Sequence, residues 1–179
     1  EMDLLCPDRD THQAYKEYLN KLSEQGDSCG GIVSFCITNP PQGLGDPVYE
    51  KLEAILAKAM MSIPATKGFE IGLGYGAVAM NGSTHNDEMN KDTIFKTNRS
   101  GGILGGISNG QNIYGTVAFK PTSSIQHKQN TLQFDLKETQ IQLNTKRHDP
   151  CIALRGTYVV KAMCCLVMID RLLANQTSI

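Results

Sequence analysis

The apolar residues of the chain recur at helical spacing in three segments. The first opens at Pro7-Asp8 and runs to about Gln25, and the glycine that follows is typical of a helix end. The second is predicted over residues 47–63, with Asp46 as its cap and a proline at its first position. The third covers residues 159–173. Its inward-facing side chains are predicted to be Ala162, Met163, Leu166, Val167 and Leu173.

Shorter stretches are rich in β-branched residues or alternate between apolar and polar residues, which predicts strands. The predicted strands are residues 31–38, 69–80, 113–120 and 151–157. Residues 131–134 and 138–143 are predicted to pair as a hairpin. Helices and strands are mixed without a regular strand–helix alternation, so the pattern favours an α+β fold. A length of 179 residues suits a single domain over residues 1–179.

The chain carries almost equal numbers of basic and acidic residues. It has 17 Lys and Arg and 18 Asp and Glu, which leaves a net charge of −1. Such a chain has no strong overall field toward nucleic acid or an anionic membrane, so neither partner is expected. The longest uncharged run, residues 100–119, contains six glycines and several polar residues, which argues against a lipid-exposed helix.

The six cysteines follow no metal-binding pattern. None belongs to a Cys-x-x-Cys pair and none is followed by histidines at zinc-finger spacing, so no metal is predicted. We expect reduced, mostly buried thiols, as in a cytoplasmic protein. The start of the chain is acidic where a signal peptide is basic, and a cytoplasmic location is therefore predicted.

The run Lys120, Pro121, Thr122, Ser123 and Ser124 combines a cation, three hydroxyl groups and a turn-forming proline directly after a predicted strand. Lysine supplies charge, and hydroxyls and turn amides supply hydrogen-bond donors, so phosphate or another oxyanion suits this run. It is not a Walker A loop, because no Gly-x-x-x-x-Gly precedes the lysine. A plain Ser/Thr turn explains the same residues, and the pattern alone leaves both readings open.

A second chemical cluster lies at residues 147–150, where an arginine, a histidine and an aspartate precede a proline. In an extended segment Arg147 and Asp149 point the same way. They could share one ligand, the arginine holding an anion and the aspartate moving a proton. The alternative is a salt-bridged turn. The glycine-rich residues 101–110 likewise suit either a flat ligand close to the backbone or tight backbone packing.

Seven motifs occur in an order that resembles the chorismate synthase family. They are Gly26-Asp27-Ser28 and residues 43–48, 61–65, 67–72, 101–110, 120–124 and 147–151. The resemblance covers nearly the whole chain but only the C-terminal half of the family, whose N-terminal motifs do not occur here. Two positions depart from the family pattern, Leu73 after Glu-Ile-Gly and Arg99 before the paired glycines.

The resemblance implies a layered β-α-β sandwich, with helices between two antiparallel sheets, that assembles as a homotetramer. It implies a lyase that converts 5-enolpyruvylshikimate 3-phosphate to chorismate and phosphate. The reaction is a 1,4-anti elimination that needs reduced FMN, for which NADPH is one candidate reductant.

The resemblance also implies roles for individual residues. The implied flavin contacts are Pro64, Ala65, Gly105, Lys120, Pro121, Thr122, Ser123, Ser124 and Arg147, and the implied catalytic residues are Asp149 and Arg147. Because the family's active site draws on both halves, we expect this chain to be inactive without the N-terminal half. The alternative reading is a truncated module for flavin or phosphate binding, or for assembly.

Overall fold

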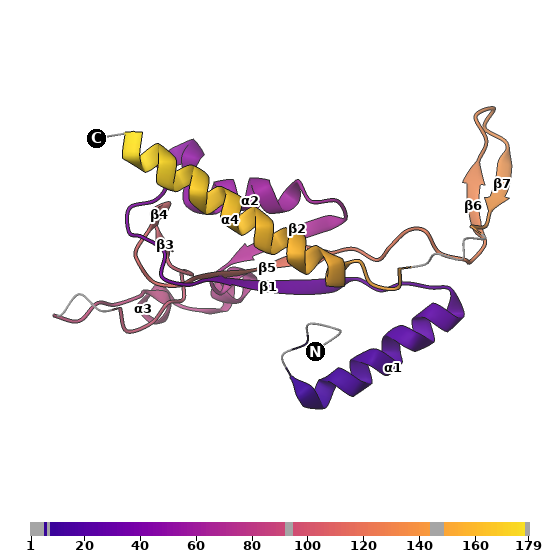
Figure 1. Ribbon diagram of the computed structural model, residues 1–179, viewed down its shortest axis with the longest axis horizontal. Coiled ribbons are helices and arrows are strands. Elements are labelled where there is room, and N and C mark those ends of the chain that lie inside the picture. Colours follow the sequence, from indigo (N-terminus) through magenta and orange to yellow (C-terminus); the bar gives the residue numbers. More distant parts are fainter. Residues whose placement is uncertain (1–5, 7, 92–94, 144–148, 178–179) are drawn as a thin grey trace.

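The centre of the molecule is a three-stranded antiparallel sheet in the order β1 (Gly31–Ile37), β5 (Ile113–Phe119) and β2 (Thr66–Ile71) (Figure 1). The computed structural model describes residue 6 and residues 8–91, 95–143 and 149–177. The strand register places Phe119 opposite both Gly31 and Thr66. The start of β1, the start of β2 and the end of β5 therefore meet at one end of the sheet.

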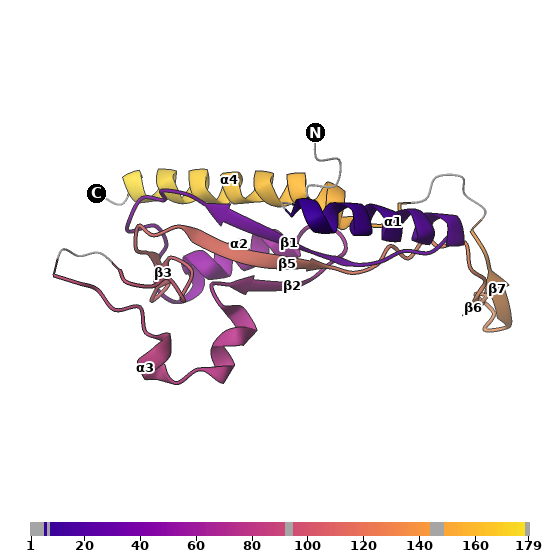
Figure 2. The same ribbon diagram turned by 90° about the horizontal axis from the view of Figure 1, so that it is seen from below.

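Two helices, α2 (Leu52–Met61) and α4 (Ala153–Thr177), cover one face of the sheet (Figures 1 and 2). Alternate residues of β5 are buried, as expected of a strand with one covered face. Val117 of β5, Leu56 of α2 and Val160 of α4 belong to one core cluster and are almost inaccessible to solvent. Each such side chain contributes roughly 1.5–3 kcal/mol through burial, so this layer holds the fold together.

Small residues let α4 lie very close to the sheet. A Cβ atom on Gly156 would lie 2.6 Å from the ring of Phe119, and one on Gly31 would lie 2.8 Å from the Cβ of Ala153. Real side chains do not approach so closely, so a larger residue at either position would push the helix away. The first turn of α4 is thereby set against the beginning of β1.

Helix α1 (Arg9–Gln25) lies beside the start of β1 (Figures 1 and 2). The Asp8 carboxylate caps it by accepting a hydrogen bond from the amide of Asp10 at 3.0 Å. Gly26 ends it in the left-handed conformation, with φ of 66°, which glycine adopts without strain. Leu19 and Leu22 are the buried residues through which α1 joins the core.

The remaining elements are short and lie around this core. They are η1 (Val48–Glu50), η2 (Gly74–Ala79), α3 (Gly82–His85), β3 (Ile103–Leu104), β4 (Ile107–Ser108), β6 (Gln129–Leu132) and β7 (Glu138–Ile141). The β3–β4 hairpin packs at the end of the sheet where β5 begins, and the β6–β7 hairpin projects beyond the opposite end (Figure 1).

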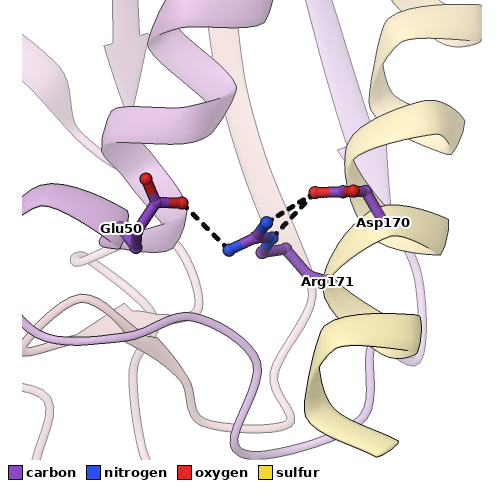
Figure 3. A network of polar contacts seen from close by, with 3 residues as sticks. All are labelled: Glu50, Asp170 and Arg171. Atoms are coloured by element: carbon purple, nitrogen blue, oxygen red, sulfur yellow. Dashed lines mark hydrogen bonds and ion pairs between the residues drawn. The ribbon is translucent and has the colours of Figure 1, made fainter. Parts of the chain in front are cut away.

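One ion-pair network fastens the far end of α4 to η1 (Figure 3). Arg171 contacts the Glu50 carboxylate at 3.0 Å and the Asp170 carboxylate at 2.6 Å. The arginine side chain is only 15% exposed, whereas both carboxylates are more than half exposed. The hydrogen bonds that the Arg171 guanidinium donates to the Asp170 carboxylate raise its pKa. The network therefore links two segments that are distant in sequence.

The α+β fold class is confirmed, and so is the predicted hairpin, which forms β6 and β7. The described residues contain one three-stranded sheet with a helix layer on one face. The second sheet of the sandwich stays a prediction. The helix predicted to begin at Pro47 starts later, because a 3-10 turn comes first and α2 begins at Leu52. No side chain caps α2, so the capping role predicted for Asp46 is wrong.

Two predicted strands are corrected. Residues 151–157 form no strand, since α4 begins at Ala153, where small residues allow a helix to lie against the sheet. The strand predicted over residues 69–80 ends at Ile71, and a 3-10 helix follows. Gly72 ends it with φ of 59° and lies so close to the backbone of Arg99 that a Cβ would collide with it.

Two further expectations are corrected in part. Within α4, Ala162, Leu166 and Leu173 are exposed, contrary to the prediction, while Val167 is buried as predicted. The cysteines are all free, but only Cys151 and Cys164 are buried, so the expectation of mostly buried thiols is wrong. No helix among the described residues is long and apolar enough to cross a membrane. The same residues contain no cluster of potential metal ligands.

Candidate functional site

The end of the sheet where β1 and β2 begin gathers most of the predicted site residues. Lys120 directly follows β5, and Ala65 directly precedes β2. The Lys120 amide donates a hydrogen bond to the Ala65 carbonyl at 2.9 Å. Ala65 has φ of 70°, a conformation that costs a non-glycine residue of the order of 1 kcal/mol or more. Strained backbone of this kind is frequent at binding sites, and here it brings the Pro64-Ala65 pair to the Lys120 turn.

A segment of five residues, Gly26–Gly30, connects α1 with β1 and lies between the two chemical motifs; we call it the bridging segment. On one side, the Ser28 hydroxyl donates to the Thr122 carbonyl at 2.6 Å. On the other side, the Cys29 amide donates to the Pro150 carbonyl at 2.8 Å. Residues 120–124, which we call the Lys120 turn, and residues 149–150, which we call the Asp149 turn, are therefore both fastened to this segment.

Two side-chain oxygens in these turns are buried without a hydrogen-bond partner, one on Thr122 and one on Asp149. Asp149 Oδ2 lies 3.3 Å from Arg155 Nε, close enough for an ion pair but without hydrogen-bond geometry. Unpaired buried polar atoms are rare because each costs about 1–3 kcal/mol. The described residues contain four such atoms, and the two on Thr122 and Asp149 lie where a polar ligand could complete them.

The charge in this region comes mainly from side chains that reach solvent. Lys120 is exposed, and no described acidic residue lies within ion-pair distance of it. Pro121, Ser123 and Ser124 are exposed as well. A cation that has no ion-pair partner among the described residues, and that lies next to hydroxyl groups, suits an anionic ligand. The backbone bends at Ser123, and the Ile125 amide donates to the Ser123 carbonyl at 3.0 Å. Both the turn reading and the oxyanion reading of the motif stay predictions.

A cluster of weakly acidic groups lies beneath the Asp149 turn. Burial, together with the neighbouring Cys151 thiol, raises the pKa of the Cys29 thiol to about 11. The same two causes, in the same order, raise the pKa of the Tyr15 hydroxyl to about 12. Cys29 and Tyr15 therefore stay protonated near neutral pH, and neither is suited to act as a nucleophile. The cluster supports the turn by packing and hydrogen bonding.

Gly105 lies elsewhere in the chain. It is in the turn between β3 and β4, beside the residues that begin β5, whereas Lys120 follows the end of β5. The seven residues of β5 separate these ends by roughly 20 Å at about 3.4 Å per residue. The chain therefore does not bring Gly105 to the other predicted flavin contacts. Arg147 lies outside the described residues.

The glycines of residues 101–110 differ in role, because some serve backbone packing and one is open to a ligand. A Cβ on Gly101 would lie 2.4 Å from the Gly72 amide nitrogen, and one on Gly102 would lie 2.7 Å from the Asn112 carbonyl, so these glycines serve backbone packing. Gly105 has φ of 62° and no atom within 4 Å of a Cβ position, so it faces open space. Only Gly105 of these three fits the approach of a ligand.

The Asp87 carboxylate organises the loop that leads into this run. It accepts hydrogen bonds from the Thr97 hydroxyl at 2.6 Å, the Arg99 amide at 2.7 Å and the Ser100 amide at 2.9 Å. Partial burial alone would raise the pKa of Asp87, but these hydrogen bonds outweigh it and lower the pKa below its ordinary value. Arg99, which departs from the family pattern, is thus held in place through its backbone amide.

The structure adds residues that the sequence analysis left without a role. Ser28 belongs to a motif that carries the resemblance, but only the fold places its hydroxyl on the Thr122 carbonyl, which is 94 residues away in the chain. Arg155 becomes the ion-pair partner of Asp149 only because α4 begins at Ala153. The Gly-Asp-Ser sequence was the one available signal for Ser28.

Comparison with known proteins gives one family. The family model described as Chorismate synthase matches residues 1–173. Chorismate synthase of Prochlorococcus marinus (strain MIT 9215) is 49% identical over 176 residues, which cover 96% of this chain and 48% of that protein. The chloroplastic chorismate synthase 1 of Solanum lycopersicum is 48% identical over 176 residues, which cover 96% of this chain and 40% of that protein.

A solved structure gives the same result for the fold. A crystal structure of chorismate synthase matches with a TM-score of 0.73 and 30% identity, over 93% of this chain and 44% of that chain. This chain thus spans about half the length of the curated relatives that it matches. Family model, sequence relatives and fold agree, and the chain belongs to the chorismate synthase family.

Proposed function

We propose that this chain supplies the C-terminal part of a chorismate synthase active site. The whole enzyme would convert 5-enolpyruvylshikimate 3-phosphate to chorismate and phosphate by a 1,4-anti elimination. The observation that carries the proposal is that the Lys120 turn and Asp149 share one support and each contain a buried oxygen without a hydrogen-bond partner. Family membership supports the assignment of this reaction.

The residues present fit an anionic flavin such as FMN. The unpaired Thr122 hydroxyl and the exposed Lys120 ammonium would hold anionic or carbonyl oxygens, and the Pro64-Ala65 backbone lies beside Lys120. Reduced FMN would supply electron density for cleavage of the carbon–oxygen bond without net oxidation. NADPH is the candidate reductant for it.

This chain's own residues would act on charge and on protons. Lys120 would attract the phosphorylated substrate or the flavin phosphate, and turn hydroxyls would orient it. Asp149 would hold or pass a proton through Oδ2, which lacks a hydrogen-bond partner, with Arg155 balancing part of its charge. Arg147 would bind the anionic substrate.

The site in this chain is incomplete. Gly105 lies at the far end of the sheet, and the chain spans about half the length of its relatives. We infer that the chain alone is inactive and that a homotetramer of complete subunits is the working form. In such an assembly Gly105 could serve the site of another copy. The predicted small-molecule substrate and cytoplasmic location remain parts of this proposal.

FMN titration of this chain, followed by flavin fluorescence with and without 5-enolpyruvylshikimate 3-phosphate, tests the proposal. Lys120→Ala should weaken FMN binding about tenfold or more, because a charge-assisted hydrogen bond is worth about 1.5–3 kcal/mol. Lys58→Ala, which removes an exposed lysine from α2, is the matched control and should bind normally. Equal affinity of both variants would reject the assignment of Lys120.

A turnover assay separates the enzyme reading from the alternative of a truncated binding or assembly module, which the half-length match favours. We expect no phosphate release by this chain with reduced FMN. Adding the N-terminal half of a relative should restore release, and Asp149→Ala should lower the restored rate by orders of magnitude while FMN affinity changes little. Restored turnover that Asp149→Ala leaves unchanged would remove Asp149 from the reaction.

A further inference from the structure

The Ser28 side chain directly joins the bridging segment to the turn at residues 120–124. Its hydroxyl donates to the Thr122 carbonyl at 2.6 Å, and the bond is partly buried. The Ser28 amide in turn donates to the Asp27 carboxylate at 2.8 Å. The serine is thus held from its own segment while its side chain reaches across to the turn.

The backbone on either side of Ser28 continues this attachment. The Gln126 amide donates to the Gly26 carbonyl at 2.8 Å, so the chain after the turn also lies along the bridging segment. A Cβ on Gly30 would lie 2.5 Å from the Phe119 carbonyl and 3.4 Å from Pro121. The Ser28 bond therefore lies between two backbone contacts that bracket residues 120–124.

The opposite side of the same segment holds the Asp149 turn. Besides the bond from the Cys29 amide to the Pro150 carbonyl, the Cys151 thiol lies 3.9 Å from the Gly30 carbonyl. A displacement of the bridging segment would consequently shift both turns. Thr122 and Asp149, which carry the buried oxygens without a hydrogen-bond partner, would then lose their relative placement.

We propose that Ser28 is a positioning residue, whose hydroxyl keeps the anion-binding turn in register with Asp149 by tying Thr122 to the bridging segment. The expected effect on ligand binding rests on the proposed function, since the ligand is FMN. The coupling between the two turns is a property of the apo chain and can be measured without a ligand. Ser28 acts through Thr122 and need not touch the ligand.

Amide hydrogen exchange of the apo chain tests the coupling first. The variants are Ser28→Ala, Ser28→Thr, which retains the hydroxyl, and Ser34→Ala, which removes an exposed serine from β1 as a matched control. In Ser28→Ala, the amides of Gln126 and Cys29 should both exchange about tenfold faster, because an ordinary hydrogen bond corresponds to about that factor. Acceleration at Gln126 alone, with Cys29 unchanged, would overturn the coupling.

FMN titration then tests the consequence. Ser28→Ala should bind FMN about tenfold more weakly, Ser28→Thr should restore most of the affinity, and Ser34→Ala should match the wild type. Loss of folding in Ser28→Ala alone would assign Ser28 to the fold and overturn its positioning role. If the wild-type chain binds no FMN, the proposed ligand fails, while the exchange result still decides the role of Ser28.

Discussion

The unpaired hydroxyl of Thr122 leads to a prediction in which stability and binding change in opposite directions. Thr122→Val keeps the shape of the side chain and replaces the hydroxyl with a methyl group. The hydroxyl oxygen is buried and has no hydrogen-bond partner. Removing an unpaired buried hydroxyl relieves a cost of about 1–3 kcal/mol, and we expect about 1 kcal/mol of added stability after imperfect packing of the new methyl.

For a domain of this length, about 1 kcal/mol corresponds to an increase in Tm of roughly 2–4 °C. Calorimetry of the apo chain measures it. In FMN titration the same variant should bind about tenfold more weakly, because the hydroxyl no longer meets the ligand. Thr122→Ser, which retains the hydroxyl, should keep the affinity.

Thr116→Val is the matched control, because the Thr116 hydroxyl donates to the Glu70 carboxylate at 3.1 Å. That substitution removes a bond already made in the protein and should lower stability by about 1 kcal/mol. The two Thr→Val variants should therefore shift Tm in opposite directions. A decrease for Thr122→Val as large as that of the control would mean that the hydroxyl already has a partner, and the reasoning would be refuted.

Three further predictions concern the thiols and the ion-pair network. Labelling with a thiol reagent near pH 8 should modify the exposed Cys36 and Cys165 first, and Cys29 and Cys164 slowly, because burial raises the pKa of the last two to about 11 and about 12. Early modification of Cys29, mapped by mass spectrometry, would contradict this order. In the folded state Cys29 and Cys164 hold their protons more tightly than an ordinary thiol, whose pKa is 9.0. The stability that these two protonated thiols contribute is therefore complete below about pH 9 and is lost as the pH rises through 11 to 12. Urea unfolding should show that decline, and it should shrink in a Cys164→Ala background. Arg171→Met should lower the free energy of unfolding by about 1–2 kcal/mol, because its two carboxylate partners are half exposed and remain partly hydrated; an unchanged urea midpoint would show that the network adds nothing.

Local sequence signals predicted the elements whose determinants are local. Helix α1 was recognisable because its apolar spacing, its start at Pro7-Asp8 and its terminal glycine all agree. Strand β5 and the β6–β7 hairpin followed from alternation over a few residues. The start of α4 was missed because residues 151–157 are short and partly apolar, a pattern that strands and buried helices share.

The candidate site was only partly predictable. The resemblance named the turn at residues 120–124 and Asp149, and the fold fastens both to one segment. The order of the motifs could not predict whether Gly105 lies near these residues, because order along the chain does not give distance across a sheet. The role of Ser28 depends on a contact over 94 residues, which no local pattern encodes.

The sequence by itself determined the family, the α+β class and the chemical types available to the site, because these depend on residue identity and short-range spacing. Only the tertiary structure decided which of those residues meet. Antiparallel pairing of β1, β5 and β2 puts three chain segments at one end of the sheet and sends Gly105 to the other. The pairing itself results from burial of the alternate strand faces beneath α2 and α4, a property of the whole chain.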